Sequence, residues 1–175
     1  MRIIDTNEQL LLRQSFVQKI TAPEYISSLD QNVLKGIHNL QYYEEEWSQI
    51  LHKVHNEPSL ENLYRFTNGI MEVYVKAIDN LAEFKTLSYA LSSLNTFIKE
   101  NANEILADHR KLNTLIMLVK HLWSDLTSWR EHIFSLQDAT DIHYLDSSFF
   151  SSCMQIEQIV GNKMIMTDDD EIDFF

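Results

Sequence analysis

The chain has 175 residues, 45% of them hydrophobic, which is enough for one substantial core and too little to require two domains. It carries 26 acidic and 14 basic side chains, for a net charge of −12. A surface this acidic repels phosphate backbones and anionic lipid headgroups, so the composition argues against nucleic-acid and membrane binding. The chain holds 3 glycines and 2 prolines. Because both residues mark turns, their scarcity predicts an all-α fold of long helices with few connections.

The cellular compartment is predicted from three features. Cys153 is the single cysteine and therefore forms no internal disulfide, which fits a reducing environment. The first residues lack the long apolar core of a signal peptide. The longest apolar run, Leu115 to Val119, is far too short to span a bilayer. We therefore expect a cytoplasmic protein.

A capping box, Thr21-Ala22-Pro23-Glu24, predicts the start of the first long helix. Apolar residues then recur at spacings of three and four, a coiled-coil-like pattern formed by Ile26, Leu29, Val33, Gly36, Leu40, Tyr43, Trp47, Ile50 and Val54. At 1.5 Å per residue, this helix would be about 50 Å long. Pro58 should end it, because the residue before a proline avoids helical geometry. A short helix from Asn7 to Ile20 is predicted to precede it.

Ser59 is the predicted N-cap of the second helix. Its apolar stripe consists of Leu63, Phe66, Ile70, Val73, Ala77, Asn80, Phe84, Leu87, Leu91, Leu94 and Ile98, in which Asn80 is the one polar residue. Two interpretations follow. In the first, Asn80 is a buried polar group in one continuous helix. In the second, the chain breaks at Asp79-Asn80 and forms two shorter helices. No glycine or proline marks a break, which favours the continuous helix.

The segment from Asn101 to Asn103 is predicted to be a turn, with Asn103 capping the third long helix. The stripe of this helix comprises Ile105, Leu112, Leu115, Val119, Leu122, Leu126, Trp129, Ile133 and Leu136. A loop from Asp138 to Asp146 should follow, and then a short helix from Ser147 to Val160 that Gly161 ends as its C′ residue.

Together these elements predict one domain over residues 1–162, an elongated antiparallel bundle with short packing helices at the N- and C-terminal ends. The bundle has three long helices, or four if the chain breaks near Asn80. Residues 163–175 form a separate flexible acidic tail.

The best arrangement for a metal ion or small ligand is His121, Asp125 and His132, which fall within about 40° of arc on the third long helix. They lie at the edge of the apolar stripe, where polar residues normally occur. The chain holds no Glu-x-x-His motif of the kind used by di-iron bundles. Our prediction is therefore no metal and no cofactor, with this trio as the alternative.

Catalytic chemistry has little support in the sequence. The carboxylates of Glu44, Glu45 and Glu46 point about 100° apart on a helix and cannot share one substrate. Glu44 alone borders the apolar stripe, where a basic side chain from a neighbouring helix is expected to meet it. Cys153 reads as a buried, inert thiol. With no glycine-rich loop or nucleophile turn, we predict a protein that is not an enzyme.

The C-terminal residues combine five side-chain carboxylates, from Asp168 to Asp173, with the apolar side chains of Ile172, Phe174 and Phe175. Charge that steers an encounter and aromatics that fill a pocket are typical of docking peptides. Residues 171–175, Glu-Ile-Asp-Phe-Phe, resemble the pentapeptide by which bacterial proteins dock on the DNA sliding clamp. That motif begins with Gln, in place of which this chain has Glu171. The resemblance implies a protein partner for this tip.

The leading functional prediction is a non-catalytic protein-protein interaction module, an adaptor or regulator in a cytoplasmic signalling complex. Tyr42, Tyr64 and Tyr74 lie off the apolar stripes, and tyrosine is a residue type that anchors interfaces. The expected partner has an apolar pocket with a basic rim. The alternative is the ligand-binding bundle centred on the histidine trio. Homo-oligomerisation is a further possibility, because the stripes offer more apolar surface than one chain may cover.

Overall fold

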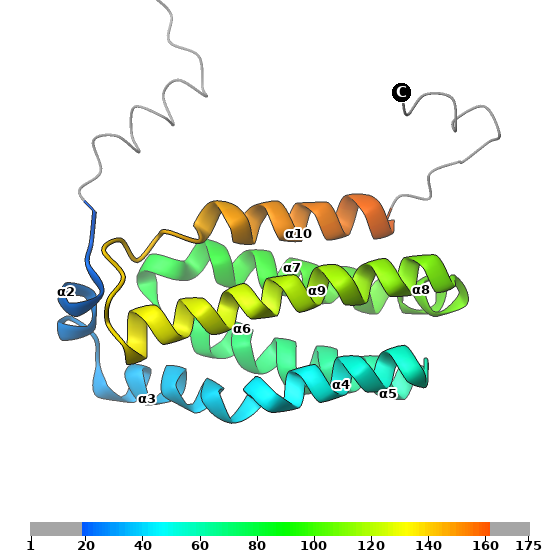
Figure 1. Ribbon diagram of the computed structural model, residues 1–175, viewed down its shortest axis with the longest axis horizontal. Coiled ribbons are helices and arrows are strands. Elements are labelled where there is room, and N and C mark those ends of the chain that lie inside the picture. The colour runs from blue at the N-terminus through cyan, green and yellow to red at the C-terminus, as the bar shows by residue number, and fades with distance from the viewer. Residues whose placement is uncertain (1–18, 162–175) are drawn as a thin grey trace, which may run out of the picture.

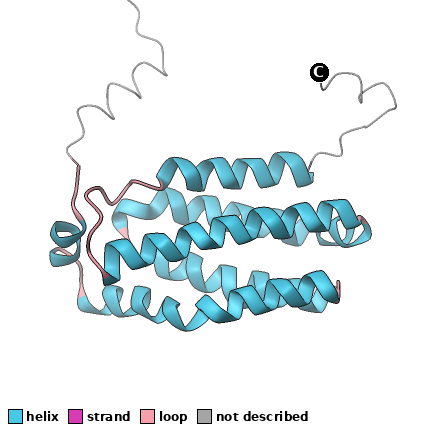
Figure 2. Ribbon diagram, viewed as in Figure 1, coloured by secondary structure: helices cyan, strands magenta, loops and turns pink. Residues whose placement is uncertain are grey.

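The computed structural model describes residues 19–161, and this part of the chain is helical with no strand, which confirms the all-α prediction for it. The helices lie side by side along the long axis and alternate in direction, and the short helix α2 lies across one end (Figure 1). Figure 2 shows that the longest connection precedes the last helix. The elements are α2 (Ala22–Ser27), α3 (Gln31–Asn39), η1 (Leu40–Tyr43), α4 (Glu44–Asn56), α5 (Leu60–Phe66), η2 (Thr67–Met71), α6 (Glu72–Asp79), η3 (Ala82–Phe84), α7 (Lys85–Glu100), α8 (Ala102–Ala107), α9 (His109–Arg130), η4 (Glu131–Ser135) and α10 (Asp146–Gly161).

The predicted cap at Thr21 is present, since its side chain accepts from the amide of Glu24 at 3.4 Å. The helix that follows is nevertheless short, and the prediction of one helix as far as Pro58 is wrong at its start. Helix α2 ends at Ser27, and the carboxylate of Asp30 accepts from the amide of Asn32 at 2.8 Å to begin α3. Aspartate is among the best N-caps, which is why the helix restarts here. The predicted end before Pro58 is confirmed, because α4 stops at Asn56.

The second predicted helix also begins as expected, with Ser59 accepting from the amide of Asn62 at 3.1 Å. Its continuity through Asn80 is wrong. Helix α6 ends at Asp79, and α7 returns antiparallel to it (Figure 1). Leu81 has an extended backbone and is buried, as is Phe84. Leu81 enters the core from an extended residue and Phe84 from the short helix η3, so the apolar spacing continues across a point where the α-helix does not.

The third predicted helix divides as well. Asn101 precedes the short helix α8, and the cap of α9 is Asp108, whose carboxylate accepts from the amide of Arg110 at 3.0 Å. The predicted start at Asn103 is therefore wrong. Helix α9 is 22 residues long, and its buried residues include most of the predicted stripe. Leu136, the last member of that stripe, is instead 58% exposed, because the helical turns end at Ser135.

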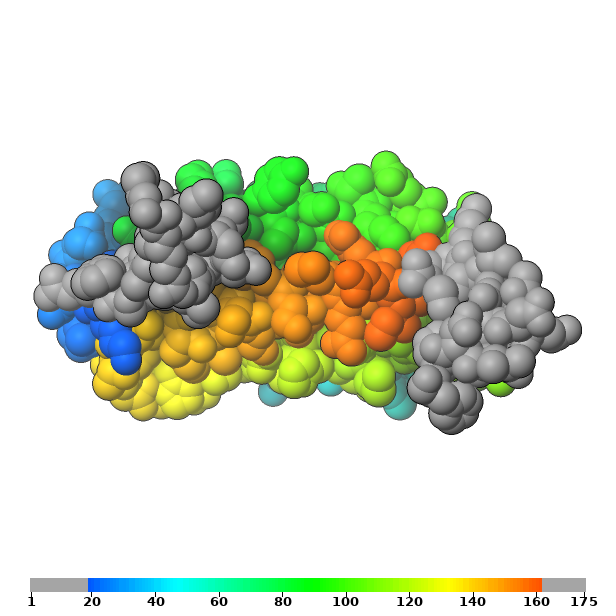
Figure 3. Space-filling model, turned by 90° about the horizontal axis from the view of Figure 1, so that it is seen from above, coloured from blue at the N-terminus to red at the C-terminus, as the bar shows by residue number. Residues whose placement is uncertain are grey.

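Helix α10 extends one residue beyond the predicted helix, Ser147 to Val160, at each end, and it packs against both α7 and α9. Figure 3 shows it lying between these two helices. Gly161, expected to adopt the left-handed conformation of a C′ residue, has no positive φ and belongs to the helix. It lies against the ring of Phe97, where a Cβ atom would come within 2.7 Å.

One end of the bundle is closed by aromatic side chains, which we call the aromatic end. Its rings are Tyr25, Phe84, Trp129, Phe134 and Phe149, paired edge to face at centroid distances of 5.1–6.5 Å. Across this end the chain around Ile20 runs beside the loop before α10. The amide of Ile142 donates to the carbonyl of Ile20, and that of Ala22 to the carbonyl of Ala139, each at 2.9 Å.

The predicted helix from Asn7 to Ile20 falls almost wholly outside the described residues, and its last residues, Lys19 and Ile20, are not helical. None of the helices in residues 19–161 combines the length and the apolar character that a membrane crossing requires.

Candidate functional site

A concave surface within residues 19–161 runs along the exposed face of α7. It consists of two hollows, of about 640 and 430 Å³, which share Tyr89 and Ser92. We call this surface the α7 groove. Its lining residues are Val75, Lys76, Asp79, Lys85, Thr86, Ser88, Tyr89 and Ser92 in the first hollow, and Tyr89, Ser92, Ser93, Thr96, Phe97, Glu100 and Glu157 in the second.

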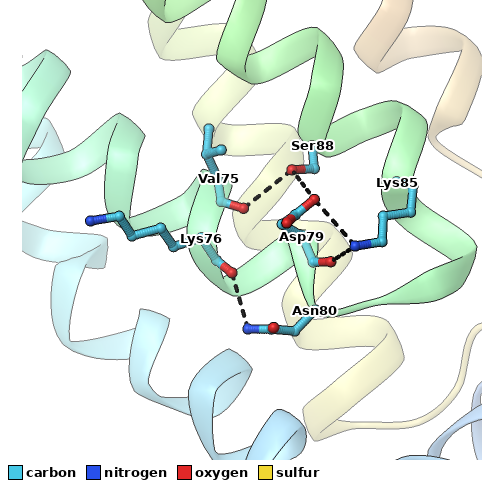
Figure 4. Close-up of polar contacts among 6 residues, drawn as sticks. All are labelled: Val75, Lys76, Asp79, Asn80, Lys85 and Ser88. Atoms are coloured by element: carbon cyan, nitrogen blue, oxygen red, sulfur yellow. Dashed lines mark hydrogen bonds and ion pairs between the residues drawn. The ribbon is translucent and has the colours of Figure 1, made fainter.

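The first hollow is lined by residues from both sides of the turn between α6 and α7. Figure 4 shows the polar contacts at this turn. Lys85 donates to the backbone carbonyl of Asp79 and lies 3.4 Å from its carboxylate. Asn80 donates to the carbonyl of Lys76 at 3.1 Å. It thereby satisfies one of the carbonyl groups at the end of α6 that have no partner within the helix. These contacts hold the turn in place and pair Lys85 with Asp79 at this end of the groove, which Lys76 also lines.

Ser88 in this hollow is buried, and its hydroxyl lies 3.2 Å from the carbonyl of Val75 and 3.4 Å from the carboxylate of Asp79 (Figure 4). A serine nucleophile needs an accessible oxygen and a base that takes its proton. Here the hydroxyl points into the contact between α6 and α7. The arrangement therefore joins two helices and presents no exposed nucleophile.

The second hollow extends from Tyr89 to the end of α10. Tyr89 is 77% exposed, although it lies at the junction of the two hollows. On the far side, Ser93 donates to the carboxylate of Glu157 at 3.5 Å. Serine and threonine residues line the middle of the groove, and the charged residues lie toward its ends: Lys76, Asp79 and Lys85 at one, Glu100 and Glu157 at the other.

The predicted ligand trio is not brought together by the fold. The imidazole of His121 is 3.7 Å from the carboxylate of Asp125. His132 instead contacts Asp138 at 2.7 Å, and Asp125 accepts from Ser148 at 2.8 Å. Within residues 19–161, no group of three or more potential ligands has the geometry to hold a metal ion. The described residues therefore form no three-ligand metal site at this trio.

His143 lies in a second polar cluster, at the start of α10. Its Nδ1 atom is 2.8 Å from Asp146, its Nε2 atom is 3.6 Å from Glu83, and its ring lies 5.2 Å from that of Phe84. The hydrogen bond to Asp146 raises the pKa of His143 against the opposing effect of burial, and the charges of Asp146, Asp141 and Glu83 add to the increase. This cluster joins the loop before α10 to the turn before α7.

The expectation for Glu44 is confirmed, since the basic side chain that meets it is Arg130 of α9. Arg130 is 5% exposed and also donates to Ser135 at 2.9 Å. Tyr74 lies nearby and is buried, and burial followed by the charge of Glu44 raises its pKa. Its prediction as an interface residue is therefore wrong, whereas Tyr42 and Tyr64 are exposed.

Cys153 is buried as predicted, and burial together with the charge of Glu157 raises the pKa of its thiol to about 12. A thiol with so high a pKa is almost wholly protonated at neutral pH, so it is a poor nucleophile and metal ligand.

The tail residues Ile172, Phe174 and Phe175 lie outside the described part of the chain. The α7 groove was not predicted from the sequence. Its signal was present as a run of serines and threonines interrupted by Tyr89 on one face of a helix, a pattern that also describes an ordinary solvated surface.

Comparisons with known proteins give no match, whether with family models, curated proteins or solved structures.

Proposed function

We propose that this chain is a non-catalytic protein-protein interaction module and that the α7 groove is its docking surface. The observation that carries the proposal is the position of Tyr89, an exposed aromatic at the junction of two hollows. Aromatic residues flanked by concave surface are the usual anchors of protein interfaces.

The shape of the groove favours a segment of protein over a small molecule. One stripe of α7, formed by Lys85, Tyr89, Ser92, Thr96 and Glu100, runs along its length. At 1.5 Å per residue, this stripe is about 22 Å long, the length of six or seven extended residues. The hydroxyl groups offer hydrogen bonds without the cost of desolvating charges.

The charges at the two ends define the chemistry of the occupant. A segment that complements them has an apolar centre over Tyr89, a basic residue near Glu100 and Glu157, and an acidic residue near Lys76, because Lys85 is already paired with Asp79. Such complementarity sets the direction of binding and the association rate more than the affinity.

The rest of the bundle serves, in this proposal, as a rigid support for the groove in a cytoplasmic regulatory complex. Helix α7 packs against α6 on one side and α10 on the other, so its exposed face is held by both neighbours. The aromatic tip formed by Ile172, Phe174 and Phe175 is proposed as a second docking element, for a partner with an apolar pocket and a basic rim.

The test is a comparative pull-down with the full chain, a Tyr89→Arg variant and a Tyr42→Arg control. Tyr42 is 80% exposed and belongs to η1, which does not line the groove. A partner that is lost with Tyr89→Arg, kept with Tyr42→Arg, and cross-linked by a photoreactive amino acid at position 92 supports the proposal. If Tyr89→Arg binds every partner that the unchanged chain binds, the groove is not the docking surface.

A further inference from the structure

Residues 136–145, between η4 and α10, form the longest connection of the described chain and cross the aromatic end. Within this connection Ile142 is fully buried, and its amide donates to the carbonyl of Ile20 at 2.9 Å. Toward the start of α7, the connection contacts η3 through His143, whose Nε2 atom lies 3.6 Å from the carboxylate of Glu83. The contact between His143 and Glu83 therefore joins the connection to the turn before α7.

The ring of His143 faces a carboxylate with each of its two nitrogens. Its Nδ1 atom is 2.8 Å from Asp146 and its Nε2 atom faces Glu83. Because an ionised carboxylate only accepts hydrogen bonds, both contacts are attractive only while both nitrogens carry a proton. A ring that has lost one proton can still donate from Nδ1 to Asp146, but it then presents the lone pair of Nε2 to Glu83. Deprotonation therefore turns the contact with Glu83 from attraction into repulsion.

The acidic groups around His143 belong to two different parts of the fold. Asp146 and Asp141 are its neighbours in sequence, and the carboxylate of Asp141 accepts from the amide of His143 at 3.1 Å, so both move with the ring. Glu83 belongs to η3. Tyr25 of α2 also lies near Glu83, but burial, followed by the charge of Glu83, raises the pKa of its phenol, which stays neutral where a histidine titrates. Of the three carboxylates that act on the ring, Glu83 is the one that separates from it if the connection moves away from η3.

We propose that His143 is a proton-dependent latch: when its ring loses a proton, residues 136–145 detach from η3 and open at the aromatic end while the helices stay folded. The hydrogen bond to Asp146 raises the pKa of His143 most, and the charge of Glu83 adds to the increase only in the closed form. The closed form therefore binds the proton more tightly than the open form. The latch holds at low pH, and its hold is lost as the pH rises through the folded pKa. This device is independent of the α7 groove.

Amide hydrogen exchange of the full chain, followed by NMR, tests the latch. The titration of the His143 ring is measured in the same samples, and exchange is compared about one pH unit below and above its midpoint. The protection factor of the Ile142 amide, which corrects for the intrinsic exchange rate, should fall about two- to fivefold across the midpoint, as expected for a partly exposed ion pair. A protection factor that does not fall would overturn the proposal.

Low concentrations of urea test whether the opening is local. Exchange at Ile142 should be insensitive to urea, because a local opening exposes little surface. Exchange at Leu122, which is fully buried in α9, should accelerate with urea as the whole fold opens. If Ile142 and Leu122 have equal protection and the same dependence on urea, the connection opens only with the whole protein and no latch exists.

Two substitutions assign the contact, and a third is the matched control. Glu83→Gln places an amide that can donate to the unprotonated Nε2 atom, so the protection of Ile142 should change less than about 1.5-fold across the midpoint. His143→Gln should also remove the pH dependence. The control is His132→Gln, since His132 belongs to a second histidine–carboxylate pair, with Asp138 at 2.7 Å, and should leave the fall in protection intact. A full fall in Glu83→Gln, or its loss in His132→Gln, would show that the latch is not the contact between His143 and Glu83.

Discussion

Helices α7 and α9 are both long and both lie against α10, yet they use their surfaces differently. The buried residues of α9 cover an arc of about 160°, at 100° per residue, and include Leu118, Trp123 and Arg130. On α7 the buried residues keep to one side, and Tyr89, Ser92 and Thr96 face solvent. The difference separates a helix that holds the fold together from one whose outer face is available for binding.

The largest effect is expected for Trp129→Ala. Trp129 is fully buried in α9 and contacts Phe84, Phe134 and Phe149 at the aromatic end. Its removal should cost about 3–5 kcal/mol of unfolding free energy, through lost transfer energy and the cavity left behind. Urea unfolding measures this. Tyr89→Ala on α7 is the control and should change stability by less than about 0.5 kcal/mol. Comparable losses of unfolding free energy for the two variants would show that the exposed face of α7 stabilises the fold as much as the buried side of α9 does.

The second largest effect is expected for Arg130→Met. This change leaves the carboxylate of Glu44 without its buried partner and should cost about 3 kcal/mol, as for other broken buried pairs. The double variant Glu44→Gln with Arg130→Met should recover part of that loss, because it removes the unpaired charge as well. A double variant whose loss of unfolding free energy equals the sum of the two single losses would show that the pair does not act as a unit.

A pH dependence is expected from His143. Its pKa is raised in the folded protein by Asp146 and the other nearby carboxylates. A raised pKa means that the protonated ring stabilises the fold at pH values below its unfolded pKa, and that this contribution is lost as pH rises through the folded pKa. The thermal midpoint should therefore exceed that of His143→Gln by more at pH 6 than at pH 8. A difference that is constant with pH would exclude this contribution.

The smallest effects compare two glycines. A Cβ atom at Gly36, within α3, meets nothing within 4 Å. Gly36→Ala should therefore raise the free energy of unfolding by about 0.5–1 kcal/mol, because alanine loses less conformational entropy than glycine in a helix. Gly161→Ala should lack this gain, because its Cβ would press on the ring of Phe97 at 2.7 Å. Thermal unfolding of both variants checks the contrast, and an equal gain at both positions would show that Phe97 moves freely away from α10.

The sequence predicted the helical class, the caps at Thr21 and Ser59 and the partner of Glu44, because each depends on local chemistry. It did not predict the break at Asn80, since Leu81 and Phe84 preserve the apolar spacing through a turn. Burial of Tyr74 was missed for a related reason. A helix covered on several sides has no single apolar stripe, so residues outside the stripe also enter the core.

The candidate groove could not be predicted, because it depends on which helices become neighbours. Lys76 and Lys85 lie on different helices, and Glu157 comes from a third. Their arrangement around Tyr89 follows from the antiparallel return at Asn80 and from the position of α10. The predicted ligand trio shows that a shared helix face does not ensure a shared site. His132 lies on the same arc as His121, but its side chain contacts Asp138 in the following loop.

The backbone contacts of Ile20 with Ile142 and of Ala22 with Ala139 bear on the order of folding. Pairs of neighbouring helices such as α6 and α7 need only short loops to meet, whereas these contacts close a loop that includes most of the described chain. The entropy cost of closing a loop grows with its length, and long-range contacts form late when local ones stabilise the fold first. We therefore expect the helical hairpins to assemble early and the aromatic end to close last.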